Sequence, residues 1–343
     1  MIYLDNAATT VCKFPASVYD DVWGNANTPY KFGLNAKQAA DECREKVKEC
    51  LGAKGGKVIF CSNASEAAKI LCDRLQAYGI STACSPYEHD SVYDLVDIEG
   101  YQFVHYGDGT AFFQQWVNPV TGIVFDIPSI RRGIGNDCFL CMDATAGIGK
   151  RFLTQSIVSS VDAIWFSGHK FHGPKTGGIL WVSDRLSKAL YLSEDSRNEY
   201  GLKHGTLDVP SFIATTYALE YTFNNSIENI WHYVELNDYL SNRAGNRVVS
   251  FKQYANYQLD ATVLIDTGCN ADALVQYLSS KGIYVGLAHS ACSADADYRV
   301  TQAFGISKET AERCIRVSFS EDNTFEDIDA LVDGIKEFKE KFV

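Results

Sequence analysis

The chain has 343 residues, of which 46% are hydrophobic, and a formal net charge of -12 with an isoelectric point near 5.1. This length suits two domains with a sizeable core, and the acidity argues against nucleic acid or an anionic membrane surface as the main partner. No apolar run approaches the length of a membrane span and Asp5 interrupts a signal-peptide pattern, so we expect a cytoplasmic protein.

The first half of the chain alternates between strand-like and helix-like segments. Residues 1–10 are extended, residues 36–51 have helical periodicity, and residues 57–79 read as a buried strand, a polar turn and a helix. The stretch "GAKGGKV" lacks the spacing of a phosphate loop, so we interpret it as a turn before that strand. Later come the unit "STACSPYEHDSVYDLV" and the apolar strands of "CFLCMDATAGIG" and "DAIWFSGHK". This alternation predicts a mainly parallel sheet flanked by helices, with ligands at the carboxyl ends of its strands.

Eleven cysteines in a chain without an export signal are expected to be reduced thiols. Cys138 and Cys141 form a CxxC pair, but the period-2 geometry of a strand directs their side chains to opposite faces. No second pair follows, so strand core is favoured over a zinc or redox site, and no metal site is predicted.

The second half of the chain contains the elements of a smaller domain. Residues 224–249 have a helical pattern, and "ATVLIDTG" and "CIRVSFS" read as strands. Residues 324–342 form an amphipathic helix with Thr324 placed to cap it. We predict an N-terminal segment at 1–12 that packs with the small domain, a large domain at 13–240, and a small α+β C-terminal domain at 241–343.

The segment "FSGHKFHGPKTGG" singles out Lys170. Taken alone, a lysine in a glycine loop is usually a solvated surface residue. Here Ser167, His169 and His172 lie close to it in sequence, and the small residues allow a ligand to approach the backbone. A lysine that bonds covalently to an aldehyde needs such a partly desolvated setting, which keeps some of its amine neutral.

The same segment resembles the lysine motif of cysteine desulfurases, which are pyridoxal-phosphate (PLP) enzymes of the class V aminotransferase family. The resemblance continues in order along the chain through "YLDNAATT", "CSNASEA", "YEHDSV", "MDATAGIGK", "HGTLDVP", "HSACSA" and "IRVSFSEDNTFEDID". It implies a fold-type I PLP-dependent transferase, and a homodimer with shared active sites.

The resemblance also implies catalytic roles. Lys170 would join the cofactor covalently and move the substrate's Cα proton, Asp143 would face the pyridinium nitrogen, and His89 would stack on the ring. Arg316 would bind the substrate carboxylate by a planar bidentate fork. Cys292 would take the sulfur atom as a persulfide. From the residues alone, a helix cap at Asp143, a structural histidine at His89 and a salt bridge at Arg316 are the alternatives.

Further residues match the family's cofactor-binding positions. Ala64 and Ser65 precede an apolar helix whose backbone N–H groups suit a phosphate. An ordinary N-cap explains the same serine. Ser167 and His169 would complete the phosphate site, and Thr206 would reach the phosphate of the neighbouring subunit.

The pattern departs from the family around the cofactor's ring hydroxyl. The family usually has an asparagine where Pro119 stands, which leaves Asn118 one residue early, and a glutamine where Ala146 stands. Proline has no donor, so Asn118 must shift to make the contact or the contact is lost.

We therefore predict a PLP-dependent cysteine desulfurase that converts L-cysteine, or an analogue, to L-alanine with a persulfide on Cys292. A sulfur-acceptor protein is a further expected partner. Two alternatives stay open, namely another class V enzyme, such as a selenocysteine lyase or an aminotransferase, and a degenerate non-catalytic homologue.

Overall fold

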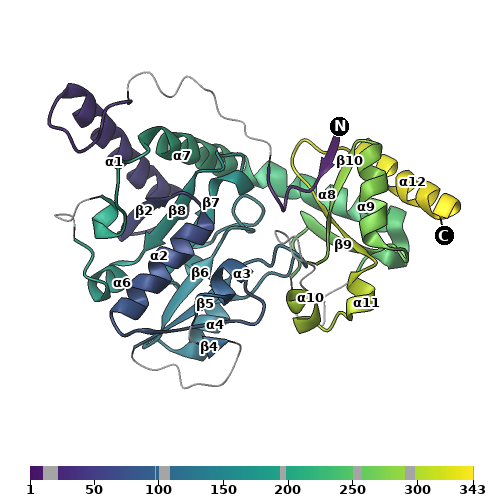
Figure 1. Cartoon of the computed structure of the whole chain (residues 1–343), viewed down its shortest axis with the longest axis horizontal. Coiled ribbons are helices and arrows are strands. Elements are labelled where there is room, and N and C mark those ends of the chain that lie inside the picture. Colours follow the sequence, from purple (N-terminus) through teal and green to yellow (C-terminus); the bar gives the residue numbers. More distant parts are fainter. Residues whose placement is uncertain are drawn as a thin grey trace. The chain divides into compact units, whose positions relative to one another are not determined.

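A computed structural model describes residues 1–10, 22–96, 98–99, 109–193, 198–249, 257–289 and 298–342. The chain forms two compact units (Figure 1). The larger unit comprises Val11–Trp116 and Asp126–Asn224, and the smaller unit comprises Met1–Thr10, Val117–Phe125 and Asn225–Val343. Each unit has its own sheet.

A seven-stranded sheet forms the centre of the larger unit, in the order β2-β8-β7-β6-β5-β3-β4. Its strands are β2 (Lys57–Cys61), β3 (Ser81–Cys84), β4 (Ile98–Glu99), β5 (Thr110–Gln115), β6 (Phe139–Asp143), β7 (Ala163–Ser167) and β8 (Gly178–Val182). Neighbouring strands from β4 through β7 are parallel, and β8 runs antiparallel to both β7 and β2. The predicted mainly parallel sheet is thus confirmed.

Apolar runs explain the strands at the centre of this sheet. Every residue of β6, β7 and β8 is buried, as expected for strands that are covered on both faces. Leu71 and Leu75, in the helix that follows β2, pack in one core with Phe113 and Trp165, whose rings lie 5.6 Å apart. Burial of such large side chains is the main stabilising term for the unit.

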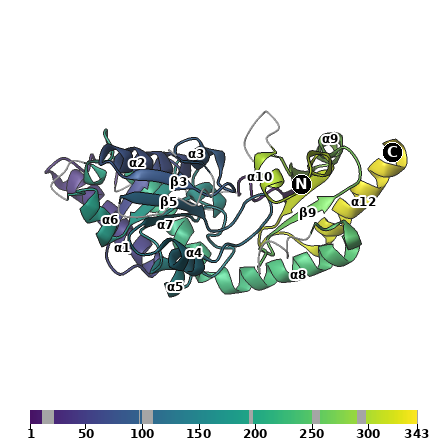
Figure 2. The same cartoon turned by 90° about the horizontal axis from the view of Figure 1, so that it is seen from below.

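Helices cover both faces of the large sheet. They are α1 (Lys31–Leu51), α2 (Ala64–Ala77), α3 (Asp90–Tyr93), α4 (Ile127–Ile134), α5 (Gln155–Val158), α6 (Asp184–Ala189) and α7 (Val209–Asn224), with short 3-10 turns η2 (Gly168–Lys170) and η3 (Glu199–Gly201). Figure 2 shows α2 and α3 on one side of the sheet and α4 and α5 on the other. Helix α1 begins at Lys31, earlier than the pattern at 36–51 predicts.

The smaller unit has a four-stranded sheet in the order β1-β10-β11-β9. Its strands are β1 (Ile2–Leu4), β9 (Thr262–Asp266), β10 (Ile283–Leu287) and β11 (Cys314–Ser318), and its helices are α8 (Ser226–Ala244), α9 (Ala271–Ser280), α10 (Arg299–Ala303), α11 (Lys308–Ala311) and α12 (Phe325–Phe342), with the turn η4 (Gly245–Arg247). Strand β1 pairs in parallel with β10, so the N-terminus belongs to this sheet. The predicted cap of the last helix is confirmed, because the Asp327 amide donates to Thr324 Oγ1 over 3.3 Å.

The cysteines of the described ranges form no disulfide with one another. Cys138 and Cys141 are fully buried next to and within β6, which confirms that they belong to the strand core. No helix in these ranges is long and apolar enough to cross a membrane.

Candidate active site

Parallel pairing brings the ends of three strands to one edge of the large sheet. Gln115 of β5 lies opposite Asp143 of β6, and Asp143 lies opposite Trp165 of β7, two residues before Ser167. Because the carboxyl ends of parallel strands share an edge, the polar residues that end these strands are neighbours. The polar residues at this edge therefore form one cluster, in the region where we predict the site.

Asp143 is a buried carboxylate at this edge, only 8% exposed. Its Oδ1 accepts a hydrogen bond of 2.8 Å from the Thr145 amide. Within the described part of the chain, no cationic side chain lies within ion-pair distance of it. Burial raises the pKa of Asp143, although the hydrogen bond from the Thr145 amide and the charges of His89 and Lys170 oppose the rise. Its environment therefore favours a cationic ligand beside the carboxylate.

His89 follows β3 and is held by the short helix that it precedes. The Ser91 amide donates to His89 Nδ1 over 3.2 Å, and Ser91 Oγ lies 2.9 Å from the same nitrogen. Because Nδ1 accepts a backbone hydrogen bond, the neutral imidazole carries its proton on Nε2. The segment before His89 is fixed to the sheet, since Gln115 Nε2 donates to the Tyr87 carbonyl and the Gln115 amide donates to Glu88 Oε1.

The lysine segment forms a closed loop between β7 and β8. The Gly168 amide donates to the Gly177 carbonyl over 2.5 Å, and the Gly173 amide donates to the Gly168 carbonyl over 2.9 Å. A Cβ on Gly177 would lie 2.0 Å from Thr215 Oγ1 of α7, so only a glycine at residue 177 lets the loop approach that helix this closely. This packing holds Lys170, which is half-buried, at the end of β7.

Ser167 is the last residue of β7 and is 1% exposed. Its Oγ is buried and has no hydrogen-bond partner among the residues that the structure describes. A buried hydroxyl without a partner is costly, so this oxygen is a group to be satisfied by a ligand.

His169 lies in a cationic environment. Burial, followed by the charges of Lys170, Lys175 and Lys150, lowers the pKa of His169 from 6.5 to about 4. The imidazole is thus neutral at neutral pH, whereas the lysines around it attract an anion.

Helix α2 presents its N-terminus beside this loop. Asn63 is the N-cap, and its side chain accepts from the Glu66 amide over 2.9 Å, while Glu66 Oε2 accepts from the Ser62 amide. The alternative reading of Ser65 as an ordinary N-cap is therefore wrong. Ala64 and Ser65 are the first two helical residues, and their N–H groups have the geometry that binds phosphate at helix N-termini.

Thr206 is an exposed residue of the loop between η3 and α7. Lys203 of the same loop forms an ion pair of 3.0 Å with Glu66, in the first turn of α2. The loop is thus tied to the helix terminus that carries Ala64 and Ser65.

Asn118 belongs to the smaller unit and closes a turn there. It is 1% exposed, and its Oδ1 accepts from the amides of Val120 and Thr121 and from Thr121 Oγ1, at 2.8 to 3.0 Å. The side-chain oxygen of Asn118 therefore accepts from three donors within its own turn.

Arg316 lies in β11 and is 1% exposed. Its Nη2 is 2.7 Å from Asp5 Oδ1, and its Nη1 donates to the Pro119 carbonyl over 3.3 Å. The salt bridge that was the alternative for Arg316 does exist, and its partner lies at the other end of the chain. Sequence reasoning missed Asp5, because only the pairing of β1 in the small sheet brings it there.

Cys292 lies outside the described residues. His289, just before that stretch, points toward Asp272, with 3.6 Å between Nε2 and Oδ1, and its ring centroid lies 5.5 Å from that of Tyr298.

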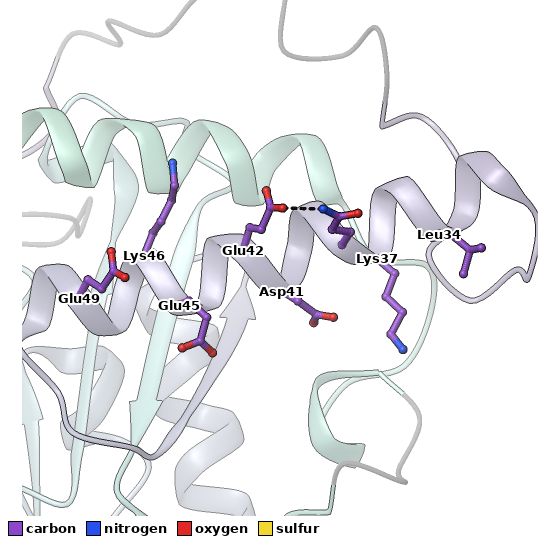
Figure 3. A pocket seen from close by; sticks show the side chains of 8 residues that line it. Leu34, Lys37, Asp41, Glu42, Glu45, Lys46 and Glu49 are labelled. Atoms are coloured by element: carbon purple, nitrogen blue, oxygen red, sulfur yellow. Dashed lines mark hydrogen bonds between the residues drawn. The ribbon is translucent and has the colours of Figure 1, made fainter.

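A separate hollow of about 740 Å³ lies on the outer face of α1 (Figure 3). All its lining residues come from α1, and they include Asp41, Glu42 and Lys46. Lys46 pairs with Glu220 of α7 over 3.1 Å, and Gln38 donates to Glu42 over 2.8 Å. Among the described residues, no other element contributes a polar group to the lining of this hollow, so the strand edge is the better candidate.

Comparison with known proteins shows the family of the chain. The profile of the Aminotransferase class-V family matches residues 2–101 and 108–331. The chain is 26% identical over 376 residues to a cysteine desulfurase IscS from Buchnera aphidicola subsp. Schizaphis graminum (97% of this chain, 91% of the relative). It is 27% identical over 381 residues to a putative cysteine desulfurase NifS from Bacillus subtilis strain 168 (97% and 93%).

Solved structures show the same fold. A NifS-like protein superposes with a TM-score of 0.84 at 23% identity, covering 99% of this chain and 100% of that one. The apo form of a cysteine desulfurase from Thermococcus onnurineus NA1 gives a TM-score of 0.78 at 17% identity, with 99% and 95% covered. The predicted fold class, mainly parallel sheet flanked by helices, is thereby confirmed.

Proposed function

The chain belongs to the class V aminotransferase family, and from that premise we propose that it uses pyridoxal 5′-phosphate to convert L-cysteine to L-alanine. The observation that carries the proposal is Asp143, a buried carboxylate that forms no ion pair among the described residues, at the sheet edge where β7 leads into Lys170. A pyridinium N–H is a cationic hydrogen-bond donor, and such a donor would pair with this carboxylate.

The residues at the sheet edge fit the rest of this cofactor. Ser167 Oγ is buried and unpartnered among the described residues, so a phosphate oxygen would satisfy it. The N–H groups of Ala64 and Ser65 and the imidazole of His169 would donate to the same phosphate. Lys170 would join the aldehyde, and His89 would lie on the ring face. The group, when bound, draws electrons away from the substrate's Cα.

The chain's own groups would bind and deprotonate the substrate. Arg316 would hold the carboxylate, which fixes the amino acid's orientation. The Lys170 Nζ atom would accept the Cα proton and return a proton to the product. The thiolate of Cys292 would attack the substrate sulfur and form an S–S bond as the Cβ–S bond breaks. The electron pair would stay on Cβ, which would take a proton, so that alanine leaves and Cys292 carries the persulfide.

The proposal extends to partners. Thr206 is exposed on a loop fixed to α2, which suits a side chain that reaches the phosphate of a second subunit. We propose a cytoplasmic homodimer with shared sites that passes its persulfide sulfur to an acceptor protein.

The test is an absorbance spectrum of the purified protein with and without L-cysteine, together with assays for alanine and sulfide. We expect a cofactor band that shifts with cysteine and is absent in Lys170→Ala, and we expect alanine with sulfide in the presence of reductant. Intact cofactor binding without alanine would contradict the proposal. Cys292→Ala should abolish desulfuration; a variant that still makes alanine would instead assign the sulfur step to another group.

A further inference from the structure

Arg316 already has a carboxylate partner within its own chain, and that partner is Asp5. We propose that Asp5 is an internal competitor that the substrate's carboxylate must displace from Arg316, which makes it a residue that determines substrate affinity and selectivity. The inference rests on the proposed function, because it takes Arg316 as the carboxylate-binding residue.

The backbone around Asp5 is fixed against β11. Asp5 forms a parallel bridge with Ser318, the Asn6 amide donates to the Ser318 carbonyl over 3.4 Å, and the Ala7 amide donates to Ser318 Oγ over 2.8 Å. Residue 5 therefore cannot drift away from residue 316 along the sheet. Its side chain alone is left to move, and that side chain is 22% exposed.

Gly286 provides the space in which the pair lies. It stands opposite Arg316 in the β10–β11 ladder, and a Cβ there would lie 2.7 Å from Asp5 Oδ1, 2.8 Å from Arg316 Nη2 and 3.0 Å from Arg316 Nε. A side chain at residue 286 would therefore collide with the Nε–Nη2 edge of the guanidinium and with the carboxylate that pairs with Nη2. This edge is one of the two forks that bind a carboxylate in a bidentate manner.

Asp5 does not use this edge fully. Its Oδ1 takes the Nη2 donor, whereas Nε is buried and has no partner within the described ranges. A substrate carboxylate on the same edge would make two parallel hydrogen bonds, so the exchange gains a bond. Arg316 is 1% exposed, and two carboxylates on one buried guanidinium repel each other, so the substrate carboxylate and Asp5 compete for it.

The exchange predicts selectivity as well as affinity. When a ligand displaces Asp5, its own carboxylate takes the place of the Asp5 carboxylate. The buried guanidinium of Arg316 therefore keeps an anionic partner. An amine that lacks a carboxylate cannot displace Asp5, and its binding is independent of this residue. L-alanine and cysteamine are suitable probes for the two cases.

The test is Asp5→Asn in the full-length protein that carries its cofactor. The amide keeps the size of the side chain and an oxygen for Nη2, and it removes the competing charge. We expect KM for L-cysteine to fall about fivefold and kcat to stay unchanged. The reason is that the hydrogen bond from Arg316 to a charged carboxylate becomes a weaker one to a neutral amide, which the substrate displaces more easily. L-alanine should stabilise this variant against heat at proportionally lower concentrations, whereas cysteamine should bind both proteins alike.

Two further variants keep the result decisive. Asp5→Ser is a second uncharged variant, should the amide not fold, and it should also lower KM. Asp266→Asn is the matched control, because Asp266 of β9 pairs with Arg313, just before β11, at 2.8 and 3.1 Å but not with Arg316. This control should keep the wild-type KM.

An unchanged or raised KM in both Asp5 variants, while the wild-type protein makes alanine from cysteine, overturns the competitor role and leaves the proposed function intact. A wild-type protein that binds its cofactor but makes no alanine overturns the proposed function instead. An equal effect on cysteamine and L-alanine would also overturn the competitor role, since it would show a general change in the site.

Discussion

Gly178, the first residue of β8, packs directly on the backbone of Asn63, the N-cap of α2. A Cβ at residue 178 would lie 2.6 to 2.7 Å from the N, Cα and C atoms of Asn63. The contact fixes the N-terminus of α2 against the strand that closes the Lys170 loop. The proposed phosphate donors Ala64 and Ser65 follow Asn63 immediately, so their position depends on the absence of one methyl group.

Gly178→Ala is therefore expected to push the first turn of α2 away from the loop. We expect a loss of about 1–3 kcal/mol in the free energy of unfolding, the usual cost of overpacking, together with weaker binding of inorganic phosphate and of pyridoxal phosphate. Denaturant unfolding and a fluorescence titration measure the two effects. Gly133→Ala is the matched control, because nothing lies within 4 Å of its Cβ and alanine favours the helix. Equal behaviour of the two variants would contradict the contact.

The strands that lead to the candidate site could be predicted from the sequence, whereas the N-cap residue of α2 could not. "FLCMD" and "AIWFS" are continuous apolar runs that end in a polar residue, so their burial and their ends follow from the pattern alone. The cap of α2 did not follow, because "SNAS" contains three residues that cap helices well and only the backbone angles of Asn63 select it. The close approach of Gly178 likewise needs the fold.

A second prediction concerns pH and His169. Its folded-state pKa of about 4 lies below the ordinary 6.5, so as pH falls from 6.5 the unfolded chain gains a proton before the folded one does. Stability should therefore decrease from pH 6.5 to about 4, by about 1–2 kcal/mol after allowing for partial exposure to solvent. In cofactor-free protein, His169→Gln should flatten the profile in this window. A phosphate ligand should flatten it too, because its charge opposes that of the lysines.

Glu199 carries a third prediction. It is 3% exposed, its Oε1 lies 2.5 Å from Arg44 Nη2, and its Oε2 accepts from the Phe60 amide over 2.7 Å. It also lies in a run of left-handed residues, with φ of 27° at Asn198, 49° at Glu199 and 58° at Tyr200. Such residues cost about 1 kcal/mol each, so the buried carboxylate holds the strained turn in place.

Glu199→Gln is expected to lower the free energy of unfolding by about 3 kcal/mol, because it leaves a buried guanidinium without its main counter-charge. Asp41→Asn removes the exposed partner of the same arginine, 2.8 Å away and 57% exposed, and should cost about 0.5 kcal/mol or less. Urea unfolding of both variants checks the difference. Similar losses in the two would mean that burial of Glu199 does not control the turn.

The relationship between Asp5 and Arg316 was out of reach of sequence reasoning for a physical reason. The two residues are 311 positions apart, and each has an ordinary local explanation, Asp5 as a turn residue and Arg316 as a strand residue with a substrate role. Only the pairing of β1 with β10, and of β10 with β11, brings them together. Long-range pairing of this kind leaves no periodic signal in either segment.

Asp143→Asn should separate stability from activity. Burial raises the pKa of Asp143, so in cofactor-free protein the folded state opposes ionisation, and stability falls as pH rises above the ordinary value of 3.8. The neutral amide, which keeps the acceptor for the Thr145 amide, removes this penalty. We therefore expect the cofactor-free variant to be about 1–2 kcal/mol more stable than the wild type at neutral pH.

The same change should reduce catalysis sharply. Without a charge at residue 143 nothing favours a protonated ring nitrogen, so kcat for cysteine is expected to fall about 100-fold or more. Thermal unfolding of the cofactor-free proteins and alanine production by the loaded proteins measure the two halves. Asp162→Asn is the control, because that buried carboxylate is paired with Arg131 at 2.6 Å, and its removal should destabilise the protein instead. A less stable cofactor-free Asp143→Asn would show that the carboxylate already forms an ion pair within the protein. That result would contradict the proposed pairing of Asp143 with the ring nitrogen.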